Sequence, residues 1–230
     1  MKSAKVLLTA AVVGGFGMMA TAQTLVYDNS SNDQVIRFNP GGAEVGDEII
    51  LAPGPERMIS QFRFQYWGQN FSGDEQIRVR FYANDAYYAS HNAFIAPGTI
   101  LFDSGPFSIV ETARQTIVLD YATLLAGNGG NPVIVPDSFT WSIQFLNVDP
   151  NAGESAGLDV YSPPTVGNSY TSYWENDPLN PGWLLKTNQW GIPMDFAAQV
   201  QAVVPEPNVL ALGLGGGLLF LLMRGRRSLR

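Results

Sequence analysis

The chain has 230 residues, no cysteine, one histidine and a formal net charge of −7. The lack of cysteine excludes disulfides, cysteine nucleophiles and Cys-ligated zinc, and a single histidine excludes zinc sites built from several histidines. Between residues 23 and 203, seven Lys or Arg residues stand against nineteen Asp or Glu residues, a net charge of −12, which argues against a nucleic-acid partner.

The first residues are typical of a secretory signal peptide. Two lysines precede an apolar run over residues 6–19, and Ala20 and Ala22 form the small-residue cleavage pattern A-x-A. We therefore expect a signal helix within residues 1–22 and a mature chain that begins at Gln23. An N-terminal anchor is the alternative, which the short apolar run and the well-placed cleavage pattern disfavour.

Residues 23–203 are long enough for one domain with a real core, and their pattern is strand after strand. In residues 76–82, Ile77, Val79 and Phe81 alternate with two arginines, the period of a strand with one buried face. The clearest such segments are residues 58–67, 76–82, 139–146 and 194–202, and the other candidates are residues 24–27, 34–38, 48–51, 100–103, 107–110, 115–119, 158–161, 169–174 and 183–186.

Gly-, Pro- and Asn-rich turns separate these segments, and only residues 121–126 suggest a helical turn. About a dozen short strands in one domain predict an all-β fold, an antiparallel β-sandwich with jelly-roll-like topology.

No catalytic signature is present in this domain. His91 lies between two predicted strands, far from any nucleophile motif, so a surface loop explains it better than a Ser-His-Asp site. A glycosidase would need two carboxylates facing one cleft, and the sequence does not show which residues could pair. The candidates are Glu75, Asp85, Asp103, Glu154, Asp159, Glu175 and Asp177. Acidic residues in turns are usually part of the turn, so we expect no enzyme and no catalytic residues.

Calcium remains open as a ligand, because it needs only oxygen donors. The Asp-x-Asp-x-Asp-Gly loop is absent, and the acidic segments best suited to calcium are residues 149–154 and 175–177. No metal ligands and no resident cofactor are predicted beyond that.

Tyrosine and tryptophan are frequent, and they admit two explanations. Exposed rings on a sandwich would suit the flat faces of sugars, whereas buried rings would simply fill the core between the sheets. Residues 170–186 are the best local candidate for a sugar site, with Trp174 and Trp183 as its ligand-binding residues.

The last 27 residues have three parts in a fixed order. Pro205, Glu206 and Pro207 come first and favour an extended segment; an uncharged apolar run over residues 209–223 follows. A basic end closes the chain with Arg224, Arg226, Arg227 and Arg230. Fifteen helical residues span roughly 22 Å, short for a bilayer core of about 30 Å. We expect a single short transmembrane helix, with the arginines in the cytoplasm and the domain outside.

This order resembles the PEP-CTERM sorting signal of Gram-negative bacteria, and the resemblance covers the tail alone. It implies recognition by an exosortase, cleavage near residues 205–207, and transfer from the inner membrane to the cell surface or extracellular matrix. It also implies a link to exopolysaccharide and biofilm. The alternative is an ordinary C-terminal anchor that happens to contain Pro-Glu-Pro.

The predicted organisation is a signal peptide in residues 1–22, a sandwich ectodomain in residues 23–203 and a sorting signal in residues 204–230. Two functions fit it. The first is a non-catalytic surface or matrix protein with exosortase, the inner membrane and exopolysaccharide as partners. The second is a lectin-like, carbohydrate-binding module, with or without calcium, on the same sandwich. Open, exposed tryptophans near carboxylates would favour the second function, and buried tryptophans the first.

Overall fold

The computed structural model describes residues 23–188 and 191–204, which form fifteen strands, one short helix and two 3-10 turns. In chain order these are β1 (Thr24–Asn29), β2 (Asp33–Phe38), β3 (Glu44–Ile50), β4 (Met58–Gln69), β5 (Gln76–Ala83), β6 (Ala86–Tyr88), η1 (Ala89–His91), β7 (Ala93–Ala96), β8 (Ile100–Ser108), β9 (Thr112–Asp120), α1 (Tyr121–Gly127), β10 (Ser138–Leu146), η2 (Pro150–Ala152), β11 (Ser155–Tyr161), β12 (Asn168–Ser169), β13 (Ser172–Asp177), β14 (Asn180–Thr187) and β15 (Ala198–Val203).

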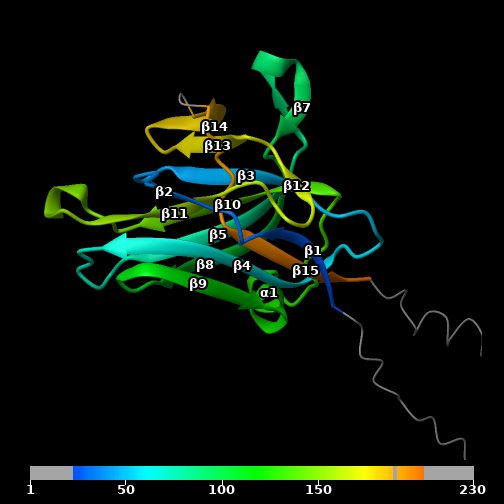
Figure 1. The fold of residues 1–230 in the computed structure, drawn as a ribbon, viewed down its shortest axis with the longest axis horizontal. Coiled ribbons are helices and arrows are strands. Elements are labelled where there is room, and N and C mark those ends of the chain that lie inside the picture. Colours follow the sequence, from blue (N-terminus) through cyan, green and yellow to red (C-terminus); the bar gives the residue numbers. More distant parts are fainter. Residues whose placement is uncertain (1–22, 189–190, 205–230) are drawn as a thin grey trace, which may run out of the picture.

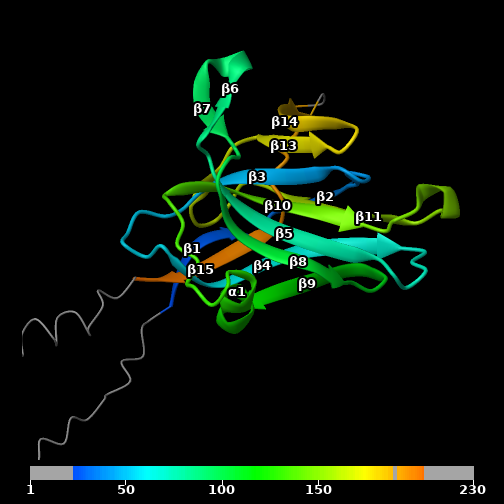
Figure 2. The same ribbon diagram turned by 180° about the vertical axis from the view of Figure 1, so that it is seen from behind.

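Two antiparallel sheets make up the body of the molecule (Figures 1 and 2). In the first sheet the long strand β4 has β9 on one side, and on the other side β15 beside its first half and β11 beside its second half. Strands β1 and β2 extend this sheet beyond β15 and β11. The second sheet has the order β14-β13-β3-β10-β5-β8, with β12 paired to β3. The prediction of an all-β, antiparallel, sandwich-like fold is confirmed.

Aromatic and branched side chains fill the space between the sheets. Ile77, Val79 and Phe81 of β5 are fully buried, as their alternation predicted. The ring of Phe62 on β4 lies 4.9 Å from that of Phe81 and 5.2 Å from that of Trp141, so the two sheets meet through aromatic contacts. Each buried ring of this size contributes about 1.5–3 kcal/mol relative to exposure.

The expected helical turn is α1, which follows β9. Its N-terminus is capped by the Asp120 side chain, which accepts a hydrogen bond of 2.9 Å from the Thr123 backbone N–H. Within the described residues, no helix has the length and apolar character required to cross a membrane. The predicted signal helix, the cleavage residues Ala20 and Ala22, and the predicted sorting motif, apolar span and arginines over residues 205–230 lie outside the described part of the chain.

Two features of the shape matter for function. Strands β1 and β15 pair antiparallel with Thr24 opposite Ala202, so the domain begins and ends at the same corner of the sandwich (Figure 1). The β6–β7 hairpin stands out from the body beside the β13–β14 hairpin (Figures 1 and 2).

Candidate ligand-binding face

The outward face of the second sheet is the candidate site, and the pairing register of its strands brings the residues of the site side by side. On β5 the residues between the core positions point outward, and the antiparallel pairing sets Arg80 opposite Ser142 of β10. Ser142 in turn faces Gly46 of β3, and Gly46 faces Trp174 of β13. Residues from four strands that are distant in sequence therefore form one row across the face.

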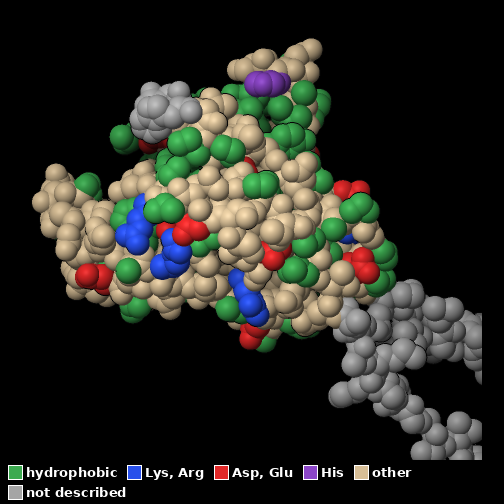
Figure 3. Space-filling view, viewed as in Figure 1, with side chains coloured by type: hydrophobic (Ala, Val, Ile, Leu, Met, Phe, Trp, Pro, Cys, Tyr) green, Lys and Arg blue, Asp and Glu red, His purple; other side chains and the backbone are tan. Residues whose placement is uncertain are grey.

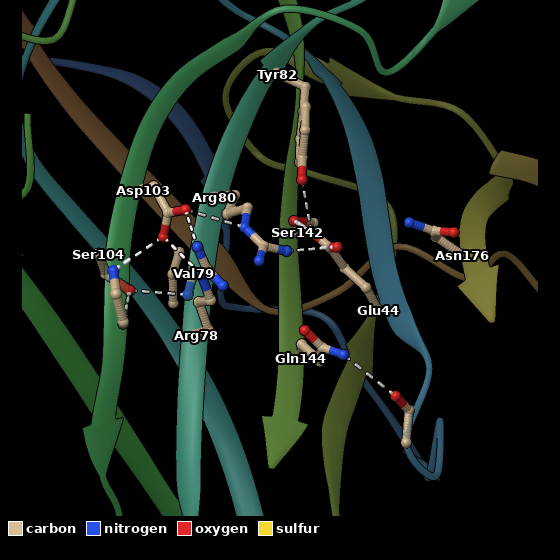
Figure 4. A network of polar contacts seen from close by, with 12 residues as sticks. Glu44, Arg78, Val79, Arg80, Tyr82, Asp103, Ser104, Ser142, Gln144 and Asn176 are labelled. Atoms are coloured by element: carbon tan, nitrogen blue, oxygen red, sulfur yellow. Dashed lines mark hydrogen bonds and ion pairs between the residues drawn. The ribbon is translucent and has the colours of Figure 1, made fainter. Parts of the chain in front are cut away.

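Glu44 is the centre of a polar network on this face (Figure 4). Its carboxylate accepts hydrogen bonds from Arg80 (2.6 Å), the Tyr82 hydroxyl (3.0 Å) and the Ser142 hydroxyl (2.5 Å). The side chain is only 6 % exposed, and the Arg80 guanidinium neutralises it at short range. Burial, followed by the charge of Glu44, raises the pKa of Tyr82, so this hydroxyl remains a hydrogen-bond donor.

Asp103 of β8 extends the network on its other side. It binds Arg78 through two hydrogen bonds, one of them 2.8 Å from Nε, and it accepts a third from Arg80 Nε at 3.2 Å. Partial burial opposes its ionisation, but the hydrogen bonds, led by that of Arg78, outweigh burial and lower the pKa of Asp103 to about 2. Two arginines and two carboxylates thus form a locally neutral cluster.

A depression of about 410 Å³ lies over this cluster. It is lined by Glu44, Arg78, Arg80, Tyr82, Ile100, Gln144, Asn176, Pro178 and Pro181. Asn176 Oδ1 accepts a hydrogen bond from the Gly182 N–H, whereas its Nδ2 has no acceptor among the described residues. Among the described residues, the Gln144 side chain makes one hydrogen bond, a long contact of 3.5 Å to the Gly42 carbonyl. Both amides lie beside the network in Figure 4 and have hydrogen-bonding capacity left for a ligand.

A second depression of about 420 Å³ lies on the same face, between the β6–β7 hairpin and the loop after β12. Phe94 is 70 % exposed and Tyr170 is 50 % exposed, and both line it. Its polar side includes Glu48, which accepts a 2.9 Å hydrogen bond from Ser138 and whose pKa is raised by burial. The second depression therefore combines exposed rings with a carboxylate.

The two glutamates of this face are too far apart for glycoside hydrolysis. Glu44 and Glu48 are four residues apart on one strand, which separates them by roughly 13 Å along β3. Retaining and inverting glycosidases need carboxyl groups about 5–9.5 Å apart. Glu44 and Glu48 therefore cannot form such a pair with each other.

Neither of the two predicted ligand-binding tryptophans is among the residues that line the two depressions. Trp174 is 1 % exposed and packs edge-on against the Tyr88 ring at 5.1 Å, so no ring face is open to a sugar. Trp183 is half-buried, with its ring 5.4 Å from Tyr82. The exposed rings on this face are instead those of Phe94, which the sequence analysis missed, and Tyr170.

The remaining candidates are dispersed. His91 lies in η1 at the end of the protruding hairpin, stacked on Tyr88 at 5.2 Å, and it is the purple residue of Figure 3. The candidate carboxylates outside the Asp103 network have partners of their own. Four accept hydrogen bonds from nearby backbone groups or hydroxyls: Glu75 from Ser72, Asp85 from Thr99, Glu154 from Asp149 and Asp177 from Leu179. Two form ion pairs: Asp159 with Arg37 and Arg114, and Glu175 with Lys186.

The acidic segment 149–154 closes on itself, because Glu154 accepts from the Asp149 N–H at 2.8 Å and Asp149 caps η2. Within residues 23–188 and 191–204, no three His, Cys, Asp or Glu residues are grouped as metal ligands. Comparison of the chain with family models, curated proteins and solved structures finds no match.

Proposed function

We propose that this chain is an exported, non-catalytic surface protein whose sandwich binds extracellular polysaccharide through the outward face of its second sheet. The observation that carries the binding function is the polar depression over Glu44, Arg80 and Asn176. Amide, guanidinium and carboxylate groups converge there on a hollow large enough for a sugar unit. Such groups are complementary to the hydroxyls of a glycan.

The neighbouring depression supports the same ligand class. Sugars have apolar ring faces as well as hydroxyls, and the exposed rings of Phe94 and Tyr170 offer a surface for such faces. The charge cluster of the first depression is neutral within a domain of net charge −12, which disfavours strongly acidic polymers. Neutral exopolysaccharide is therefore the ligand class that fits best.

We infer a jelly-roll connectivity for the sandwich. The first sheet contains the order β2-β11-β4-β9 and the second the order β3-β10-β5-β8. Along the chain these eight strands alternate between the sheets, except that β5 and β8 are neighbours in the second sheet. Eight strands in two such sheets are the jelly-roll arrangement, which lectin domains share. This likeness of fold raises the expectation of ligand binding and does not by itself assign it.

The binding function is tested with exopolysaccharide purified from the producing cells and a panel of neutral oligosaccharides, by isothermal titration calorimetry. Asn176→Ala combined with Gln144→Ala should weaken binding at least about tenfold, a loss of about 1.4 kcal/mol. Asn151→Ala, in the exposed η2 turn, is the matched control and should bind as the wild type does. Unchanged affinity in the double variant, or no glycan binding by the wild type, would refute the binding function and leave a purely structural surface protein.

Export and sorting are proposed from the two ends of the chain. The described sandwich occupies residues 24–203, between the signal-like segment and Pro205-Glu206-Pro207, and this placement supports sorting by an exosortase through the tail. Replacing the three motif residues by alanine should leave a full-length, membrane-bound chain, as should deletion of the exosortase. An identical mass and location in wild-type and variant cells would favour an ordinary anchor instead, whatever the glycan experiment shows.

A further inference from the structure

A buried acidic seam joins the first and last parts of the domain on the side away from the binding face. It consists of Tyr27 on β1, Asp47 on β3, Ser169 on β12 and Asp195 in the segment that leads into β15. Asp47 points into the sandwich, opposite in phase to Glu44 and Glu48, and is fully buried. It accepts 2.7 Å and 3.0 Å hydrogen bonds from the Ser169 hydroxyl and the Phe196 N–H.

No Lys or Arg in the described part of the chain compensates the negative charge of this seam. Neither Asp47 nor Asp195 forms an ion pair with any described Lys or Arg side chain. Burial, followed by the charge of Asp195, raises the pKa of Asp47, and burial raises that of Asp195 to about 6. The other charged groups that act on the seam, Asp28 and Glu48, are also acidic. Two buried carboxylates without compensation cost several kcal/mol each.

Oxygen atoms in the seam also lack partners. Asp195 Oδ1 and the Tyr27 hydroxyl oxygen are buried, and neither has a hydrogen-bond partner among the described residues. Burial, followed by the charges of Asp47 and Asp195, raises the pKa of Tyr27. The Ser169 hydroxyl gives its one proton to Asp47, so it has none left to donate to Asp195 Oδ1.

We propose that this seam binds a calcium ion through Asp47, Asp195 and the neutral oxygens of Tyr27 and Ser169. All the atoms that could coordinate a metal here are oxygens, the ligands that Ca²⁺ prefers. The two positive charges of the ion would balance the two carboxylates. A proton neutralises one carboxylate, whereas a divalent cation neutralises both and is bound by several oxygens at once. The ion would connect β1, β3, β12 and the entry to β15, and therefore both sheets and both ends of the domain. The proposal does not depend on glycan binding.

The affinity should be modest, because affinity rises with the number of charged ligands and only two are present. Extracellular calcium modules of this kind have dissociation constants of about 10⁻⁴–10⁻³ M. At about 10 mM Ca²⁺ the melting temperature of the EDTA-treated full-length chain should rise by about 3–10 °C. Mg²⁺ at the same concentration should give little or no shift, because it is reluctant to shed its waters.

The decisive variant is Asp195→Asn, which keeps the side-chain shape and removes one charge. It should lose the calcium shift, lose the bound ion in equilibrium dialysis, and melt at or above the wild-type temperature in EDTA. Tyr27→Phe removes only a neutral oxygen and should weaken calcium binding severalfold with little change in EDTA, which covers the case in which Asp195→Asn fails to fold. Glu175→Gln, in an acidic segment outside the seam, is the control and should keep the full shift.

Two results would overturn the proposal. A calcium shift that survives in both seam variants would place the ion elsewhere. The absence of any shift in the wild type would show that the seam binds no calcium.

Discussion

Glu44→Gln tests whether the network on the binding face is also a structural element. The substitution removes the charge and sets an amide N–H₂ or a single oxygen opposite Arg80, Tyr82 and Ser142, all of which donate to Glu44. At least one of the three donors must lose its acceptor. Hydrogen bonds to charged groups contribute about 1.5–3 kcal/mol, and breaking a buried ion pair costs about 3–5 kcal/mol.

The expected loss lies towards the lower part of that range, because Arg80 keeps its contact with Asp103 at 3.2 Å. We expect about 2–4 kcal/mol, which for a domain of this size lowers the melting temperature by about 4–16 °C. Glu175→Gln removes the same charge from a pair with Lys186 at 3.3 Å in which both side chains are partly exposed. That control should change stability by less than about 0.5 kcal/mol.

Thermal unfolding followed by tryptophan fluorescence measures both variants under one condition. If Glu44→Gln melts within about 2 °C of Glu175→Gln, the network is no more than a surface ion pair and the reasoning fails. A further variant separates stability from binding: Glu44→Leu, Arg80→Met, Tyr82→Phe and Ser142→Ala together replace the ion pair and its two hydroxyl donors by apolar groups, an exchange that is often neutral or stabilising. It should fold with a near wild-type melting temperature and lose glycan affinity.

Three further substitutions test other parts of the structure. Asp103→Asn should destabilise the protein at neutral pH. Because the pKa of Asp103 is lowered to about 2, the difference in unfolding free energy between wild type and variant, measured by urea titration, should disappear as the pH falls from about 4 to 2. A difference that stays constant over this range would contradict the prediction. Trp174→Ala should lower stability by about 3–5 kcal/mol in urea unfolding, and weaker glycan binding without that loss would show that the ring is not buried. Gly157→Ala should lower the melting temperature by several degrees, because the added Cβ would overlap the Phe38 carbonyl of the paired strand β2; an unchanged melting temperature would contradict that close approach.

The fold could be predicted where a strand has one apolar and one polar face. Residues 76–82 and 139–146 alternate with period two, and β5 and β10 cover them. Strand β3 is harder to predict from the sequence, because Glu44, Asp47 and Glu48 place charge on both of its faces. Only the end of this strand was predicted. The β6–β7 hairpin has strands of three and four residues, too short to show any period.

The candidate site could not be assembled from the sequence because its parts are far apart in the chain. Arg78 and Arg80 were visible as the polar face of a strand, but their partners Glu44 and Asp103 come from β3 and β8, and only the strand register brings them together. The one available signal for the acidic seam was Asp47, which shares the apolar phase of β3 with Val45 and Ile49. An acidic residue in that phase predicts a buried carboxylate that needs compensation.

The pairing of β15 limits where the tail can be removed. This strand lies between β1 and β4, and its Val200 and Ala202 are fully buried, so residues up to Val203 belong to the core. A chain that ends after Val204 should be exported, soluble and cooperative in unfolding. One that ends after Ala197 should not fold, since β1 would lose its partner strand and the first half of β4 would lose its neighbour on one side. Circular dichroism and size exclusion of the two truncations measure the difference. If the chain ending at Val204 fails to fold, residues beyond it are needed by the domain, and cleavage near Pro205 could not release a stable sandwich.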